Sequence, residues 1–283
     1  MSEPLIDKAQ ACRAFSRAAP TYDEAAVLQR EVSRRLQSRL DLVRLEPENI
    51  LDLGCGTGEQ TQALLRRYSR SRVLALDFAL PMLDIARRRG RWRRRPRCVC
   101  GDMEQLPLAD ASIDLLISNL AFQWAAQPAQ LYAECLRVLR PGGLLMFTSF
   151  GPDTLKELRA AWREVDRAPH VSPFMDMHDL GDILVDTGFA APVMDVEQMV
   201  LTYATVDDLM RDLKQIGASN ASSGRSRGLT GKARMQAMRD AYESWRCEGV
   251  LPASYEIVYG HAWAPENKNA PRQVSIPLRQ LAD

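Results

Sequence analysis

Three glycines at alternate positions form the segment of this chain whose spacing most clearly indicates chemistry. Residues 51–58 read Leu-Asp-Leu-Gly-Cys-Gly-Thr-Gly, so Gly54, Gly56 and Gly58 follow an apolar run and precede a segment of helical composition. A turn of this kind between a buried strand and a helix brings backbone N–H groups close to a nucleotide or nucleoside. We therefore expect a nucleoside-binding loop here.

Acidic residues follow this loop at positions where two further strands are predicted to end. The apolar run at residues 73–76 leads into Asp77, nineteen residues after Gly58. A Rossmann-like unit places its ribose-binding carboxylate at about that distance. Asp102 and Met103 follow the next predicted strand. This order indicates a βαβ unit with a nucleoside at the carboxyl ends of its strands.

The glycine pattern also indicates which nucleoside is bound. Dinucleotide folds use Gly-x-Gly-x-x-Gly, which lets a pyrophosphate approach the backbone, whereas this chain has Gly-x-Gly-x-Gly. The pattern resembles the first motif of the class I methyltransferases that use S-adenosylmethionine. Residues 113–119 look like the fourth strand of that family and residues 139–143 like the turn into its fifth strand, so the resemblance runs through residues 51–149.

This resemblance implies a set of cofactor-binding residues. Together with the loop glycines, Asp52 would orient the loop or the ammonium group of S-adenosylmethionine. Asp77 would accept hydrogen bonds from the ribose hydroxyls, and Asp102 with Met103 would hold the adenine. The backbone of Asn119 is expected to face the methionine part. Each feature alone has a plainer alternative, namely a tight turn, a helix N-cap or, for Asp52, a cap of the loop, but their joint order favours the cofactor.

Composition limits the classes of function. The chain has 283 residues and a formal net charge of +1, which gives no general reason to expect a nucleic-acid partner. It has no run of eighteen apolar residues and no apolar signal-peptide core near its start, so we expect a soluble, cytoplasmic protein with no membrane partner. The cysteines lack metal-type paired spacing and the histidines are dispersed, so we expect no metal site.

A run of arginines is a local exception to the near-neutral charge. Residues 87–97 contain eight arginines. They indicate either a phosphate-binding stripe or the solvated end of a helix that stops near Gly90. We favour the helix end, because blocks of like charge are commonly exposed surface.

The order of predicted elements suits one enlarged α/β methyltransferase domain. Its parts are a helical lid, a cofactor-binding core, a substrate-side region, a last strand and a polar tail, at residues 8–42, 49–149, 152–250, 254–263 and 264–283. Residues 193–203 predict a further strand, which leaves residues 204–250 as a helical insertion before the last strand. We expect the Rossmann-like seven-stranded sheet of class I methyltransferases, with the last strand antiparallel.

Further segments along the chain make the resemblance closer. They are similar to the malonyl-acyl-carrier-protein O-methyltransferases of biotin synthesis at the segment around Tyr22 and at residues 118–124, 150–158, 188–189, 213–220, 228–231, 251–256 and 259–263. The resemblance covers about residues 8–265. It implies methyl transfer from S-adenosylmethionine to the free carboxylate of a malonyl thioester, with a malonyl-carrying acyl carrier protein as partner.

The implied reaction needs little catalytic apparatus, because a malonyl carboxylate is already ionised at neutral pH and requires no general base. Tyr22 would close over the sulfonium as the candidate catalytic residue, with a plain core tyrosine as the alternative. Gln123 and Trp124 would form a wall of the substrate pocket, although Trp124 also suits simple packing. Arg225 and Arg227 would bind the malonyl carboxylate or the phosphopantetheine arm of the carrier, with a solvated loop as their alternative.

An acidic carrier protein would also need a basic rim around the pocket. The expected contact set lies in the insertion and consists of Arg225, Arg227, Lys232 and Arg234.

Two other functions stay open. Residues 150–158 and 170–174 also resemble a methyltransferase-like assembly factor of respiratory complex I, which would act on a protein partner. A small-molecule carboxyl methyltransferase is the third option. The sequence around Tyr22 favours the biotin enzyme over the assembly factor, and the third option leaves the insertion unexplained.

Overall fold

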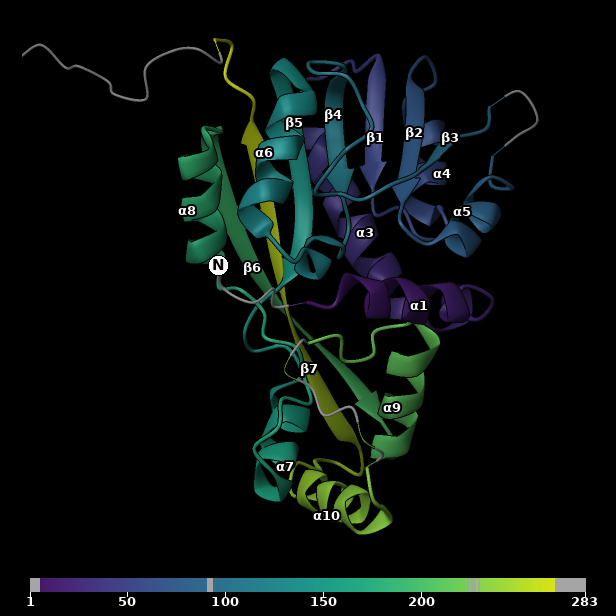
Figure 1. Ribbon diagram of the computed structural model, residues 1–283, viewed down its shortest axis with the longest axis vertical. Helices are drawn as coiled ribbons and strands as arrows, with labels where there is room; N and C mark the ends of the chain where they lie inside the picture. The colour runs from purple at the N-terminus through teal and green to yellow at the C-terminus, as the bar shows by residue number, and fades with distance from the viewer. Residues whose placement is uncertain (1–5, 91–93, 223, 225–227, 229, 268–283) are drawn as a thin grey trace, which may run out of the picture.

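A seven-stranded mixed sheet forms the centre of the molecule, in the strand order β3-β2-β1-β4-β5-β7-β6 (Figure 1). The computed structural model describes residues 6–90, 94–222, 224, 228 and 230–267. The strands are β1 (Asn49–Leu53), β2 (Arg72–Asp77), β3 (Arg97–Cys100), β4 (Ile113–Ser118), β5 (Leu139–Phe150), β6 (Ala190–Tyr203) and β7 (Leu251–Trp263). Strands β1 to β5 pair in parallel, and β7 is antiparallel to both β5 and β6. The expected class I methyltransferase fold is confirmed.

Helices cover both faces of this sheet, because successive side chains of a strand point to opposite faces. In β4, Leu115 and Ile117 belong to a core with helices α3 and α4, while Leu116 belongs to a second core with α6 and α8. The helices of the sheet region are α3 (Val27–Arg39), α4 (Glu59–Arg67), α5 (Leu80–Ala86), α6 (Pro128–Val138) and α8 (Met177–Thr187). Burial on both faces explains why the central strands read as continuous apolar runs.

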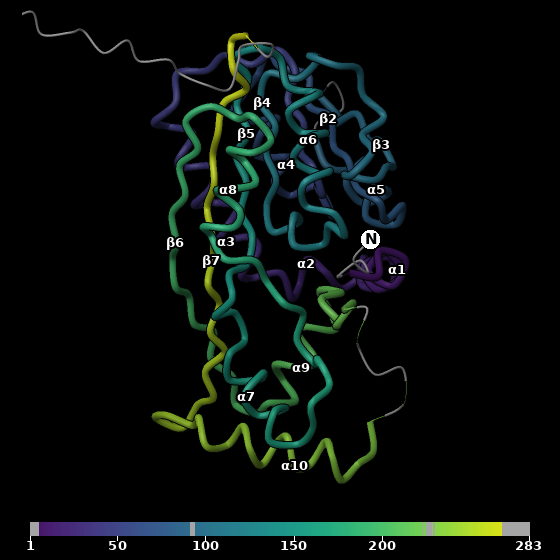
Figure 2. Tube along the Cα trace, turned by 60° about the vertical axis from the view of Figure 1, so that its left-hand side comes forward, coloured from purple at the N-terminus to yellow at the C-terminus, as the bar shows by residue number. Residues whose placement is uncertain are grey.

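The last two strands extend past the rest of the sheet and carry a second group of helices. The final pair between β5 and β7 joins Phe150 to Ile257, whereas β6 and β7 continue to pair as far as Tyr203 with Leu251. Helices α7 (Lys156–Val165), α9 (Val206–Gln215) and α10 (Lys232–Glu243) pack around this extension (Figure 2). The insertion between β6 and β7 therefore lies beyond the carboxyl ends of the parallel strands.

The N-terminal helices lie between the sheet and this extension. Helix α1 (Lys8–Ala18) crosses below the carboxyl ends of β1 and β2, and the short α2 (Tyr22–Ala25) follows it (Figure 1). The backbone N–H of Asp7 donates to the carbonyl of Ala221 at 2.8 Å, and the Thr21 hydroxyl donates to the carbonyl of Gln215 at 3.2 Å. Both contacts join the N-terminal segment to the insertion.

Local details differ from the expected boundaries. Strand β7 begins three residues before the expected Ser254, and the expected turn at residues 139–143 lies within β5, where pairing with β4 shifts register. Helix α5 ends at Ala86, and part of the arginine run has a specific partner, because Arg89 forms an ion pair with Asp23 of α2.

No helix of the described residues is long and apolar enough to cross a membrane. Within the same residues, no group of three or more histidine, cysteine, aspartate or glutamate side chains could hold a metal ion.

Candidate active site

The glycine loop joins β1 to α4 and has the close approach that its sequence predicts. The backbone N–H groups of Gly54 and Cys55 both donate to the carbonyl of Leu76, at 2.8 and 3.0 Å. Gly54 has a φ of +72°, and a Cβ built on it would lie 2.3 Å from the Cβ of Ala121. Only glycine fits such a position without displacing its neighbour.

Asp77 supports this loop from the end of β2. Its carboxylate accepts the backbone N–H of Gly56 at 2.9 Å and that of Ala79 at 2.8 Å. Burial raises the pKa of Asp77 to about 6, although the backbone hydrogen bonds oppose the shift. The carboxylate lines a cavity between the loop and the N-terminal helices, where a ligand hydroxyl can reach it.

Asp52 faces the other way. Its two carboxylate oxygens accept hydrogen bonds from the side chains of Gln60, at 3.0 Å, and Thr61, both in α4. Burial raises its pKa to about 6. Asp52 does not line the cavity beside the loop, so of its two predicted roles the geometry fits orientation of the loop rather than contact with a ligand ammonium.

The cavity beside the loop brings together eight of the predicted site residues. These are Tyr22, Gly54, Gly56, Asp77, Asp102, Met103, Asn119 and Trp124. Gly58 does not line this cavity. A Cβ built on Gly58 would lie 2.8 Å from the Cβ of Ala86 in α5. Gly58 therefore serves the packing of the loop on α5.

Aromatic side chains of the N-terminal helices narrow this cavity. Phe15 of α1 and Tyr22 of α2 are in its wall, and Phe15 also packs edge-on against Trp124 with ring centroids 5.1 Å apart. The cavity measures about 50 Å³, whereas ligand sites commonly hold roughly 300–1,000 Å³. The cavity would therefore have to widen to hold a nucleoside ligand.

Polar contacts also hold these helices over the loop. The ammonium group of Lys8 in α1 lies 2.5 Å from a carboxylate oxygen of Asp102 and 2.7 Å from one of Glu104. Burial alone would lower the pKa of Lys8. Its hydrogen bonds to the two carboxylates outweigh burial, so the net pKa is raised above the ordinary value. Asp102, the predicted adenine contact, therefore already has a partner on α1.

A second polar cluster fixes α2 to the loop itself. The hydroxyl of Thr57 donates to the carboxylate of Asp23 at 2.6 Å, and Arg89 forms an ion pair with the same carboxylate. Burial raises the pKa of the adjacent Tyr22, and the carboxylate of Asp77 adds to the effect. Tyr22 is therefore a neutral phenol at physiological pH, which can donate a hydrogen bond.

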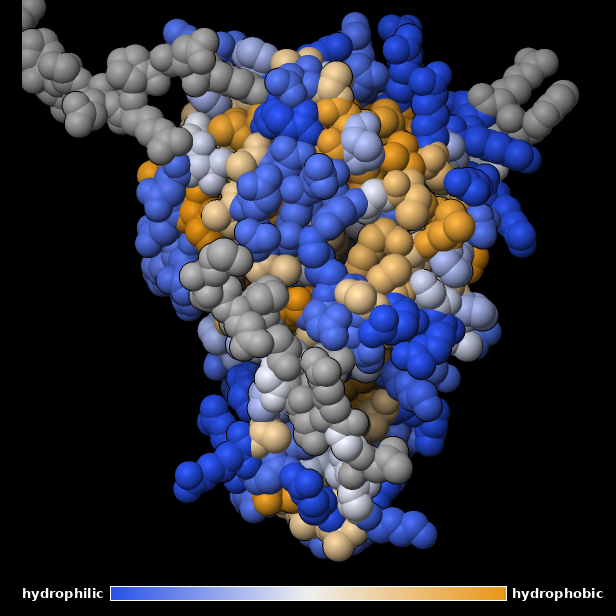
Figure 3. Space-filling view, in the orientation of Figure 1, coloured by the Kyte–Doolittle hydropathy of each residue, from blue (hydrophilic) through white to orange (hydrophobic). Residues whose placement is uncertain are grey.

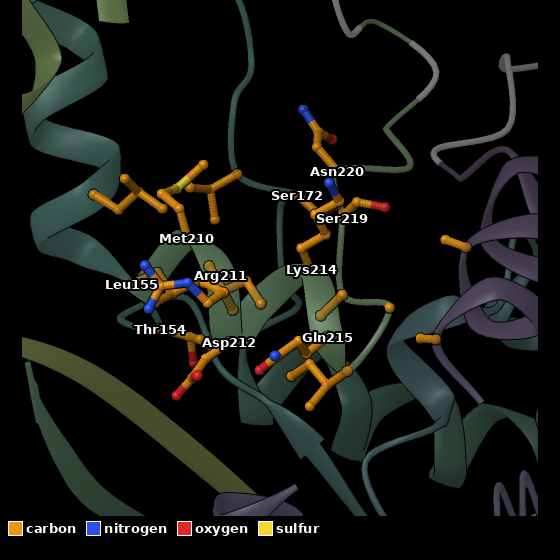
Figure 4. Close-up of a pocket in the computed structure, with 18 of the residues that line it drawn as sticks. Thr154, Leu155, Ser172, Met210, Arg211, Asp212, Lys214, Gln215, Ser219 and Asn220 are labelled. Carbon is orange, nitrogen blue, oxygen red and sulfur yellow. The ribbon is translucent and has the colours of Figure 1, made fainter. Parts of the chain in front are cut away.

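A much larger cavity, of about 1140 Å³, adjoins this site on the side of the insertion. Trp124 lines both cavities, and Gln123 lines the larger one. Figure 4 shows side chains of α9, among them Arg211 and Lys214, around this cavity. A hollow between the upper and lower parts of the molecule, with apolar side chains at its edge, is visible in Figure 3.

Two amide side chains in the wall of the larger cavity have unused acceptors. Among the described residues, no donor reaches the side-chain oxygens of Gln29 and Gln123, although both atoms are buried. The amide nitrogen of Gln123 donates to the carbonyl of Leu120 at 2.7 Å, which fixes its orientation. Both oxygens therefore keep unused hydrogen-bonding capacity in residues that line the cavity.

Some residues of the cavity wall were not predicted from the sequence, and two predicted residues lie outside the part of the chain that the structure describes. Lys8, Phe78 and Met82 line the cavity beside the loop without having been predicted. For Lys8 no local signal exists, because its partners lie more than ninety positions away in the chain. Arg225 and Arg227 lie outside the described residues.

Comparison with known proteins shows to which family the chain belongs. Residues 51–147 match a methyltransferase domain family. The chain is 54% identical over 273 residues to a malonyl-acyl-carrier-protein O-methyltransferase of Methylovorus sp. (strain MP688), covering 94% of this chain and 92% of that protein. An enzyme of the same name from Laribacter hongkongensis (strain HLHK9) is 54% identical over 285 residues, covering 98% and 93%. The chain belongs to the malonyl-acyl-carrier-protein O-methyltransferase family.

The solved structures agree at the level of the fold. An S-adenosylmethionine-dependent methyltransferase from Thermotoga maritima superimposes with a TM-score of 0.53 at 17% identity, covering 90% of this chain and 99% of that chain. As a member of the methyltransferase family, the chain is an enzyme whose methyl donor is S-adenosylmethionine.

The residues beside the glycine loop fit this cofactor. Gly56 leaves room for a ligand, because a Cβ built on it would meet Tyr22 at 4.0 Å and nothing nearer. The wall there combines the carboxylate of Asp77 with the apolar side chains of Met103 and Leu120.

Proposed function

We propose that this enzyme transfers a methyl group from S-adenosylmethionine to the free carboxylate of malonyl-acyl-carrier protein, the ester-forming step that begins pimeloyl formation in biotin synthesis. The relatives that carry this name match the insertion as well as the core, since they cover more than nine-tenths of the chain. The observation that carries the proposal is the large cavity under the insertion, which adjoins the cofactor cavity at Trp124.

The size and lining of that cavity suit a thioester on a long arm. A malonyl group alone would leave most of about 1140 Å³ unfilled. A phosphopantetheine arm contains two amide groups, whose N–H donors match the unused acceptors of Gln29 and Gln123. The wall also contains apolar side chains such as Leu158, Phe174 and Met210, which suit the methylene groups of the arm.

The residues of the site can promote this reaction by positioning. Bound S-adenosylmethionine supplies a methyl group already activated by its sulfonium charge. The malonyl carboxylate is ionised at neutral pH and needs no base. Tyr22, held neutral, is placed beside Gly56 to donate a hydrogen bond and to exclude water. Correct placement of the two reacting atoms is worth roughly 7–11 kcal/mol of the barrier.

The N-terminal helices act in this proposal as a lid. They line both cavities, through Tyr22 on the cofactor side and Ala14 on the substrate side. The narrow cofactor cavity fits a closed lid, which would open to admit the cofactor and then shield the reaction from solvent.

Genetic complementation tests the proposed pathway. The gene should restore growth without biotin to a bacterial strain that lacks its malonyl-acyl-carrier-protein methyltransferase. The Asp77→Asn variant is the inactive control, because its amide nitrogen can accept neither a ribose hydroxyl nor the backbone N–H of Gly56 or Ala79 that it would face. Expression of folded enzyme without growth would contradict the pathway, and methylation of a protein partner instead would favour the assembly-factor alternative.

A further inference from the structure

A second cavity, of about 480 Å³, opens next to the large substrate cavity and carries a group of arginines. The two cavities share a wall made by Trp162, Pro169, His170, Val171 and Phe174. Arg159, Arg163 and Arg167 line the second cavity. We call these three residues the arginine cluster.

The first arginine of the cluster is held in place by the backbone. Arg159 donates to the carbonyl of Pro152 at 2.7 Å and to that of Thr154 at 3.0 Å. Arg163 follows four positions later in helix α7, so both side chains project from one face of that helix. Burial lowers the pKa of Arg159, and the charge of Arg163 lowers it further. A partly buried cation, Arg159, and an exposed one, Arg163, therefore stand close together.

The nearby carboxylates are bound to other residues. Within the part of the chain that the structure describes, no carboxylate forms an ion pair with a member of the arginine cluster. Asp166 also lines the cavity, but it pairs with His170, at 2.8 Å, and with Arg234. Asp153 lies 3.9 Å from Lys156. Among the described residues, the wall of this cavity thus carries three guanidinium groups without an ion-pair partner, although the charge of Asp153 acts on Arg159.

We propose that the arginine cluster binds the phosphate of the phosphopantetheine arm that carries the malonyl thioester. This inference rests on the proposed function. Guanidinium groups bind phosphate through paired, charge-assisted hydrogen bonds, and a phosphate supplies the charge that the cluster lacks. With the phosphate in the second cavity, the proposal requires the arm to cross the wall that the two cavities share, so that its thioester reaches the large cavity and Trp124.

This placement differs from the phosphate contacts expected from the sequence. Of the residues predicted to contact the acyl carrier protein, Arg234 already forms an ion pair with Asp166. The cluster lies on α7 and the segment that follows it, before β6, rather than in the insertion.

Two protein-free substrates that differ only in the phosphate test the proposal. They are malonyl-4′-phosphopantetheine and malonyl-pantetheine, each assayed with the wild-type enzyme and with the double variant Arg163→Gln/Arg167→Gln. Arg159 is left intact because it also holds the backbone of residues 152–154. The matched control is Arg44→Gln/Arg70→Gln, which removes two exposed arginines that precede β1 and β2.

The wild type and the control should have a KM for the phosphorylated substrate about tenfold below that for malonyl-pantetheine. The cluster variant should lose this difference, with unchanged kcat and unchanged cofactor affinity. A difference that persists in the cluster variant would overturn the proposal. So would an effect seen only with intact malonyl-acyl-carrier protein, since the arginines would then contact the protein surface. Wild-type enzyme that fails to methylate malonyl-acyl-carrier protein would instead refute the proposed function itself.

Discussion

Asp77, the last residue of β2, and Asp52, one residue before the end of β1, are both buried carboxylates that differ in their hydrogen-bond partners. Asp77 accepts backbone N–H groups of the glycine loop and borders the cofactor cavity, whereas Asp52 is bound by side chains of α4. The position of Asp77 could be predicted, because a strand end and a spacing define it. The partners of Asp52 could not, since Gln60 and Thr61 look like ordinary helix residues in the sequence.

Cofactor affinity should depend on pH through Asp77. Its pKa is raised to about 6, and the ionised form is the better acceptor for ribose hydroxyls. Affinity should therefore be complete above that pH and decrease as the pH falls through about 6. Asp77→Asn should bind S-adenosylmethionine at least about tenfold more weakly and lose the pH dependence. Isothermal titration calorimetry between pH 5 and pH 8 measures both, and an equally steep pH profile in the variant would exclude Asp77 as the cause.

The Tyr22→Phe variant keeps the ring of Tyr22 and removes its hydroxyl, so it distinguishes a chemical role of this residue from a steric one. If the neutral phenol donates a hydrogen bond in the transition state, its loss should lower kcat about tenfold while the cofactor Kd changes little. Tyr22→Ala, which also removes the ring from the cavity wall, should weaken cofactor binding as well. Steady-state kinetics and a binding assay on both variants measure these effects. A Tyr22→Phe enzyme with wild-type kcat would show that only the ring matters.

At the level of helices and strands, backbone geometry determines which features could be predicted from the sequence. The glycine loop has a distinctive pattern because Gly54 approaches Ala121 too closely for any side chain. The early start of β7 was missed because Pro252 is typical of a strand boundary. The proline is accommodated because β5 has ended there, and β7 pairs at this point with β6.

Gly54→Ala tests the close approach in the loop. The added methyl group would overlap Ala121, and the positive φ would be strained, so we expect a loss of about 2 kcal/mol or more in the free energy of unfolding. Gly231→Ala is the control, since nothing lies within 4 Å of its added Cβ. Urea denaturation compares the two variants. Equal stability would mean that the loop relaxes freely and has no need of glycine.

Lys8→Gln tests whether α1 acts as a lid. Its ion pairs to Asp102 and Glu104 are partly exposed, so their loss should favour the open lid by only about 1 kcal/mol. Because a more open lid exposes the cofactor cavity more often, the cofactor should both associate and dissociate severalfold faster. Stopped-flow fluorescence can follow the reaction through Trp124, which lines both cavities. Arg44→Gln serves as the charge control, and unchanged rates in Lys8→Gln would argue against a gate held by this ion pair.

At the scale of the whole molecule, three separate parts of the chain create the large cavity. The N-terminal helices, the extension of β6 and β7, and the helices packed on that extension all contribute to its wall. The N-terminal helices, the two strands and the helical insertion were expected from the sequence. Their meeting was not, because it depends on how far β6 and β7 pair beyond β5. The arginine cluster was overlooked for the same reason, since only the fold places α7 beside the cavity.

The central claim is that this enzyme esterifies malonyl-acyl-carrier protein. The most direct test is intact-mass spectrometry of malonyl-acyl-carrier protein incubated with the purified enzyme and S-adenosylmethionine. We predict a mass gain of one methyl group, removed by mild alkaline hydrolysis as expected of an ester, and no gain on acetyl-acyl-carrier protein, which lacks the free carboxylate. Enzyme that binds the cofactor but leaves the malonyl carrier unmodified would contradict the account.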